Sequence, residues 1–188
     1  MSYLFFRGDG TGLFANKIIL SYIRQMTREH LLRTIADPDG TLPEVKLEHV
    51  GRSIDQDIYA AISDDEHIGT MKLGSVKPGE SFIAVQGSGV DERLKGRGYG
   101  LAMYLGAAAL AYDSGHRLMS DVMVSRDAAR LWGRLERHGF ARIWTPFQWR
   151  GSERYSHRGH ALFVPAEELP LPDSVRRMED NADIWQNM

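Results

Sequence analysis

The spacing of apolar residues divides this chain into an N-terminal helix, a run of short strands, and a second half in which strands and helices alternate. Apolar residues recur at helical spacing over residues 13–35, and the turn-forming residues 37–40 end that pattern. The pattern then shortens into strand-like stretches at 44–50, 57–63, 67–73 and 81–90. Three carboxylates at 64–66 separate the second and third stretches and predict a hairpin.

Helices and strands alternate in the second half. Residues 98–113 have helical spacing, and Gly115 follows as a residue suited to end a helix. Residues 117–124 are strand-like, Ser125 is suited to cap a second helix that Gly139 ends, and two last strands are expected at 141–150 and 159–165. This order predicts an α/β fold with a central mixed, mostly antiparallel twisted sheet of about six or seven strands and helices on both faces.

Length and composition limit the protein to one core and a few classes of chemistry. A chain of 188 residues, 43% hydrophobic, is too short for two ordinary domains. We expect one domain over residues 1–165. Residues 166–188 are acidic and interrupted by proline, which predicts a tail or docking arm, and copies of the chain could associate through it.

Several kinds of site are excluded or disfavoured. No apolar run approaches the roughly 20 residues that span a bilayer, and the start lacks the basic leader of a signal peptide. The absence of cysteine removes disulfides and thiolate chemistry and fits a reducing, cytoplasmic compartment. We expect no metal site, because His157 and His160, three apart on a strand, would point to opposite faces.

The net charge of −2 conceals a basic central segment. Residues 93–160 contain twelve Lys and Arg against five Asp and Glu, so this segment carries +7 and the remainder −9. Such a segment faces an anion, either a phosphorylated cofactor or a nucleic acid, or else it forms the solvated faces of two helices.

A glycine-rich stretch between a predicted strand and a predicted helix is the most informative feature. Gly96, Gly98 and Gly100 alternate through the sequence VDERLKGRGYG, which begins at Val90. Glycines let backbone N–H groups face a ligand at close range, and the following helix adds the positive end of its dipole. Together they predict a cradle for a diphosphate. The spacing G-x-G-x-G is not the dinucleotide fingerprint, and the Gly-Lys-Ser/Thr ending of a P-loop is absent.

These residues resemble the coenzyme A loop of the GNAT superfamily of N-acetyltransferases. The family pattern Arg/Gln-x-x-Gly-x-Gly/Ala is matched from Lys95 to Gly100, with Lys in place of Arg or Gln, after a strand that ends in valine. The second family motif resembles Ser125, Ala128, Leu131 and Trp132 followed by Gly139 and Phe140. The clear match spans residues 85–140.

The resemblance implies transfer of an acetyl group from acetyl-coenzyme A to a primary amine by direct attack in a ternary complex. The pantetheine arm would lie between two splayed strands, along residues 86–90, and the loop amides would hold the phosphates. The cofactor-binding residues implied are Ser88, Val90, Lys95, Gly96, Arg97, Gly98, Tyr99, Gly100 and Ser125. The candidate catalytic residues are Asp91 and Asp121 as bases and Ser125, which replaces the family's asparagine.

One departure keeps other functions open. Trp132 stands where the family has a tyrosine that serves as the acid, and an indole N–H does not give up its proton at useful pH. A degenerate GNAT-fold binding or structural module is therefore one alternative, for example a phage particle or host-interaction protein, since the second motif resembles phage-encoded members. A phage-encoded protein of this kind would be located in the host cytoplasm or in the virion. A nucleic-acid-modifying transferase is another. The acceptor, a small molecule or a protein, is left open.

Overall fold

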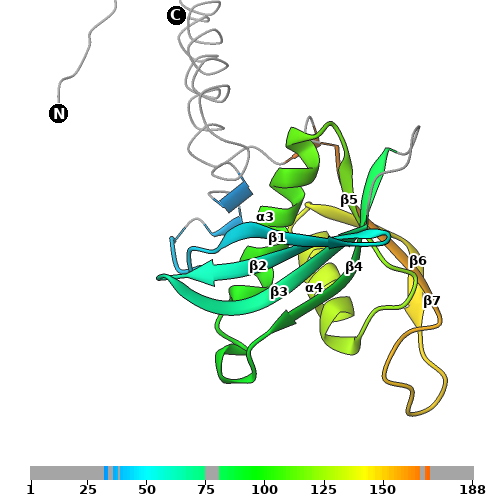
Figure 1. Ribbon diagram of the computed structural model, residues 1–188. Coiled ribbons are helices and arrows are strands. Elements are labelled where there is room, and N and C mark those ends of the chain that lie inside the picture. The colour runs from blue at the N-terminus through cyan, green and yellow to red at the C-terminus, as the bar shows by residue number, and fades with distance from the viewer. Residues whose placement is uncertain (1–31, 34–35, 38, 75–80, 166–167, 170–188) are drawn as a thin grey trace, which may run out of the picture.

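The computed structural model describes residues 32–33, 36–37, 39–74, 81–165 and 168–169, and these build one seven-stranded sheet (Figure 1). Its spatial order is β1-β2-β3-β4-β5-β7-β6. All neighbouring strands are antiparallel except the parallel pair β4 and β5. The strands are β1 (Lys46–Ser53), β2 (Gln56–Ser63), β3 (Glu66–Gly74), β4 (Phe82–Val90), β5 (Arg117–Ser120), β6 (Ala141–Gln148) and β7 (Arg158–Phe163). The expected mixed, mostly antiparallel sheet is confirmed.

The first four strands form an antiparallel meander. The turn between β2 and β3 places Asp64 and Asp65 at φ +48° and +62°. Two consecutive residues with positive φ suit a two-residue hairpin, because that twist matches the twist of the paired strands. The hairpin predicted at 64–66 is therefore confirmed.

Two helices link the remaining strands. Helix α3 (Tyr99–Asp113) joins β4 to β5 and contacts β1, β4 and β5, while α4 (Arg126–Arg137) follows β5 and contacts β6. Eleven of the fifteen α3 residues are buried, as expected for a helix that is apolar all round. The small residues of its middle, such as Ala107 and Ala108, are fully buried and let the helix lie close to the sheet.

An aromatic stack fills the core between the two helices. Trp132 of α4 is fully buried. Its ring meets Tyr104 of α3 edge-on at 5.5 Å and Phe163 of β7 at 5.6 Å. These ring contacts fix the positions of α3 and α4 relative to β7.

The strand expected at 117–124 is shorter in the structure, because β5 ends at Ser120. Its antiparallel neighbour pairs with it only at Met119. Beyond that point Ser156 takes over: its Oγ accepts a hydrogen bond from Val124 N at 3.1 Å and donates one to Val122 O at 3.3 Å. A side chain from a distant loop therefore replaces a strand ladder over these residues.

The ends of the described chain also contact the sheet. The helix expected at 13–35 lies almost wholly outside the described residues, but Leu32 is buried and Arg33 donates to the carbonyls of Pro43 and Val45. Of the expected tail, only Glu168 and Leu169 are described, and Glu168 forms an ion pair with Arg142. No helix within the described residues is long and apolar enough to cross a membrane.

Candidate active site

The sheet opens between β4 and β5. The two strands pair only from Phe82 with Arg117 to Val85 with Ser120. Residues 87–90 stay paired with β3 on one side, yet no described strand pairs with residues 86–90 on the other. The register with β3 also slips between Lys72 and Leu73, which leaves Gln86 as an extra residue in β4. Such a bulge bends a strand and re-aims its backbone groups, here where the two strands part.

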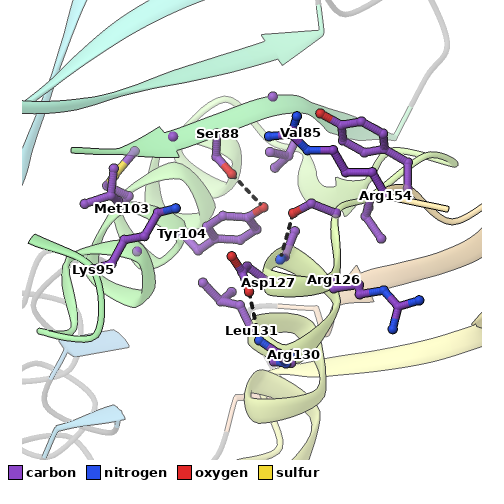
Figure 2. A pocket seen from close by; sticks show the side chains of 18 of the residues that line it. Val85, Ser88, Lys95, Met103, Tyr104, Arg126, Asp127, Arg130, Leu131 and Arg154 are labelled. Atoms are coloured by element: carbon purple, nitrogen blue, oxygen red, sulfur yellow. Dashed lines mark hydrogen bonds and ion pairs between the residues drawn. The ribbon is translucent and has the colours of Figure 1, made fainter. Parts of the chain in front are cut away.

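A cleft of about 1020 Å³ lies beside this opening. Five parts of the chain wall it: the far half of β4, the turn into α3, the first two turns of α3, the start of α4 with the segment before it, and the loop between β6 and β7 (Figure 2). We call it the β4–α4 cleft. The last wall forms where residues 152–155 lie against residues 122–125. Hydrogen bonds of Ser156 and a bridge between Ser125 and Tyr155 hold these two segments together.

The glycine turn at the mouth of the cleft leaves the start of α3 uncapped. A short 3-10 helix, η1 (Glu92–Leu94), leads into Gly96 at φ +79° and Gly98 at φ +90°. Gly98 is the N-cap of α3 and makes no side-chain hydrogen bond to the N–H groups of the first turn. The first turn of α3 contains no acidic residue. Free N–H groups and the helix dipole together favour an anion at this end.

The three glycines have different roles. A Cβ at Gly96 would meet nothing within 4 Å, so that face of the turn is open. A Cβ at Gly98 would lie 2.9 Å from Leu42 Cδ2 and 3.1 Å from Pro43 Cδ, so Gly98 packs against the chain before β1. Gly100 lines the cleft, and a Cβ there would make only an ordinary contact of 3.6 Å with Leu131. Gly100 is thus the glycine whose enlargement narrows the cleft with least damage to the fold.

Cationic side chains surround the cleft. Lys95, Arg126, Arg130 and Arg154 all line it. Lys95 Nζ lies 2.7 Å from Glu92 Oε2, and this hydrogen bond raises the pKa of Lys95 above its ordinary value. The guanidinium of Arg126 lies 5.5 Å from the centre of the Trp149 ring. The lining therefore suits a polyanion such as a phosphorylated cofactor.

Of the residues predicted for the cofactor, Ser88, Val90, Lys95, Gly96, Gly100 and Ser125 line the cleft, whereas Arg97, Gly98 and Tyr99 do not. Ser125 also caps α4, since its Oγ accepts a hydrogen bond from Ala128 N at 3.2 Å. The predicted cap is therefore confirmed.

The two predicted bases lie off the cleft lining. Asp91 caps η1 and holds Arg93 at 2.9 Å, and the hydrogen bonds from Arg93 lower the pKa of Asp91 to about 2. A carboxylate so stabilised is a weak base. Asp121 accepts a hydrogen bond from Val122 N at 2.6 Å. The carboxylates that do line the cleft are Asp127 and Glu153.

Tyr104 and the β6–β7 loop were not among the predicted site residues. The Tyr104 hydroxyl lies 3.2 Å from Ser88 Oγ, and both side chains line the cleft (Figure 2). The sequence did carry a signal for Tyr104, because it is a hydroxyl-bearing residue one helical turn after Gly100, which places it on the same face of the helix. The loop at 152–155 had none, since its approach depends on contacts 30 to 34 positions away along the chain.

Comparison with known proteins gives matches only among solved structures. No family model matches the sequence, and no curated protein matches it. The chain is similar to structures of GNAT family acetyltransferases. One, from Elizabethkingia anophelis with acetyl-CoA bound, is 12% identical, with a TM-score of 0.47 over 64% of this chain and 97% of that one.

Two further structures are similar to the same degree. The Bacillus subtilis acetyltransferase in complex with CoA is 14% identical, with a TM-score of 0.46 over 65% of this chain and 97% of that one. The Vibrio cholerae spermidine N-acetyltransferase in complex with CoA and spermine is 11% identical, with a TM-score of 0.46 over 61% and 68%.

Proposed function

We propose that this protein is an acetyl-coenzyme A-dependent N-acetyltransferase. One observation carries the proposal: the unpaired half of β4 and the uncapped glycine turn at the start of α3 open onto the same cleft. A long cofactor with an amide-bearing arm and a diphosphate needs both features, because its arm can pair with a free strand edge while its charge meets helix N–H groups.

The residues present fit that cofactor. Backbone groups of residues 86–90 would bind the acyl arm, and the N–H groups of Gly96 and Gly100, which both line the cleft, would hold the diphosphate, assisted by Lys95. Arg126 and Arg130 also line the cleft and would bind a further phosphate group. When bound, acetyl-coenzyme A supplies an activated acetyl thioester, and the unpaired β4 amides are the donors available to polarise its carbonyl.

The acceptor, a primary amine on a small molecule or a protein, would enter beside the β6–β7 loop. We assign Glu153 to receive it. Glu153 lines the cleft, where its Oε2 accepts a hydrogen bond from Arg150 N at 3.0 Å and lies 3.7 Å from His157 Nδ1, whereas Asp127 is held more closely by the Arg130 guanidinium at 2.9 Å. A carboxylate in this position attracts a protonated amine and can take up the proton that it loses.

The test combines binding and turnover. Acetyl-coenzyme A should raise the melting temperature, because a ligand that binds only the native state stabilises it. Release of free thiol should then require an amine, which a panel of polyamines, amino acids and peptide N-termini would identify. The proposal is refuted if acetyl-coenzyme A leaves the melting temperature unchanged and no amine in the panel causes release of free thiol.

Two other outcomes would point to the alternative functions. A melting shift without turnover by any amine would favour a binding or structural module. Binding of nucleic acid that weakens steeply with salt, without thiol release from small amines, would favour a nucleic-acid-modifying transferase, since phosphate contacts release counterions.

A further inference from the structure

Trp132 does not reach the place where an acid would be needed. Its ring is fully buried against Tyr104 and Phe163 and does not line the cleft. Its indole N–H has no hydrogen-bond partner among the described residues, so it points into the core rather than toward a reacting group. If the proposed acetyl transfer occurs, another side chain must stabilise the leaving sulfur, or that sulfur leaves unaided.

We propose, on the basis of the proposed function, that Tyr104 is the catalytic hydrogen donor to the leaving thiolate. Tyr104 projects from α3 toward the far half of β4, and its hydroxyl lies 3.2 Å from Ser88 Oγ (Figure 2). Ser88 belongs to the stretch of β4 that has lost its β5 partner, which is the stretch assigned to the acyl arm. The phenol therefore borders the space where the thioester would lie.

The hydrogen bond between the two hydroxyls leaves one hydrogen free. Each group can donate a single hydrogen, and either atom can be the donor in this pair. When Ser88 donates to Tyr104, the Tyr104 hydrogen is free to point into the cleft. Ser88 is thus a positioning residue, because it acts through Tyr104.

The surroundings keep this phenol protonated and in place. Burial raises the pKa of Tyr104 above its ordinary value, and the hydrogen bond with Ser88 opposes that shift only in part. The ring itself is 3% exposed and is held edge-on by Trp132 at an interplanar angle of 83°. A neutral, immobilised donor loses little entropy when it meets a developing charge. Trp132 therefore supports the donor instead of replacing it.

The proposed step balances as follows. The amine nitrogen forms a bond to the acetyl carbon, and the carbon–sulfur bond breaks with its electron pair moving to sulfur. Tyr104 donates its hydrogen to that sulfur, and the phenolate regains a proton from water in the cleft. The amine's proton passes to Glu153 or to solvent, so the products are the amide and the free thiol.

Replacing Tyr104 by Phe tests this assignment, since it removes only the hydroxyl and keeps the ring that packs on Trp132. With the amine found in the panel, we expect kcat to fall about 100- to 1,000-fold, the range of a single acid or donor group. The melting shift caused by acetyl-coenzyme A should remain. Ser88→Ala should lower kcat less, by a few fold, because it removes only the orienting hydrogen bond.

A second readout separates catalysis from structure. An analogue of acetyl-coenzyme A in which oxygen replaces the thioester sulfur has a far more basic leaving group. Its reaction therefore depends more strongly on a hydrogen donor. The ratio of thioester to oxygen-ester rates should therefore rise in Tyr104→Phe. Tyr112→Phe is the matched control: it removes a buried hydroxyl from the same helix, bonded to Val164 O, and should leave this ratio unchanged.

The outcomes are distinguishable. An unaltered protein that binds acetyl-coenzyme A and releases thiol, together with a Tyr104→Phe variant of equal kcat and equal rate ratio, overturns the role of Tyr104 alone. An unaltered protein that neither binds acetyl-coenzyme A nor releases thiol with any amine overturns the proposed function and this role together. If Tyr104→Phe does not fold, an unchanged rate ratio in Ser88→Ala overturns the assignment.

Discussion

Substitution of Gly100 by Asp tests the proposed diphosphate site. Of the three glycines in the turn, Gly100 is the one that can be enlarged with least disturbance of the surrounding packing. Gly100 is the second residue of α3 and lines the cleft. The new Cβ would touch only Leu131, at 3.6 Å. An acidic residue in the first turn also suits the helix dipole, so the variant should fold at least as well as the parent protein. Only an anionic ligand should be disfavoured.

The expected loss follows from electrostatics. Two unit charges about 5 Å apart repel by about 3 kcal/mol at an effective dielectric constant near 20. Water in the cleft and the neighbouring cations reduce this repulsion, while the second charge of a diphosphate increases it. We therefore expect the dissociation constant for acetyl-coenzyme A to rise about 100-fold, which corresponds to about 2.7 kcal/mol.

Thermal melting with and without acetyl-coenzyme A measures this loss. At a concentration 100 times the dissociation constant, the ligand stabilises the unaltered protein by about 2.7 kcal/mol, and after a 100-fold loss by only about 0.4 kcal/mol. For a chain of 188 residues, each kcal/mol moves the melting temperature by about 2–4 °C. The shift should therefore fall from about 5–11 °C to about 1–2 °C.

Gly100→Ala is the matched control, because it adds the same Cβ without charge. It should keep most of the ligand-induced shift and melt slightly higher without ligand, since alanine favours a helix over glycine by up to about 1 kcal/mol. A full ligand-induced shift in Gly100→Asp would refute the reasoning, because no diphosphate could then lie at the start of α3.

Three further predictions concern the scaffold of the site. Gly98→Ala should lower the melting temperature more than Gly96→Ala does: both residues have positive φ, but only the first would press its Cβ against neighbouring side chains at 2.9 and 3.1 Å. Equal losses in the two variants would contradict this role of packing. Tyr112→Phe should cost about 1–3 kcal/mol in urea unfolding, because it leaves a buried carbonyl without its donor, and an unchanged midpoint would argue against that bond. Because Arg93 lowers the pKa of Asp91 to about 2, the stabilisation from this carboxylate should be present above its unfolded pKa near 4 and vanish as the pH falls through about 2. NMR titration of Asp91 should give a midpoint near 2, and a midpoint near 4 would show that the pair with Arg93 does not persist in solution.

Local chemistry was enough to predict the elements that carry the cofactor loop. Asp64 and Asp65 formed the predicted hairpin, and Ser125 caps α4 as its place before a helical stretch indicated. Helix α3 starts after Gly98 as predicted, because a left-handed glycine and the apolar spacing that follows are both local properties. The glycine turn could therefore be placed from the residues alone.

Contacts between distant residues decided the rest. The length of β5 depends on how far its neighbours pair with it, and apolar spacing within residues 117–124 contains no information on that. The hydroxyls of Ser88 and Tyr104 meet across the 16 positions that separate a strand from a helix. The sequence alone determined that a strand and a glycine turn precede a buried helix. Only the packing of α3 and α4 on the sheet decided that Trp132 faces inward while Tyr104 faces the cleft. The neighbouring elements decide whether a given face of a helix is buried or lines a cleft.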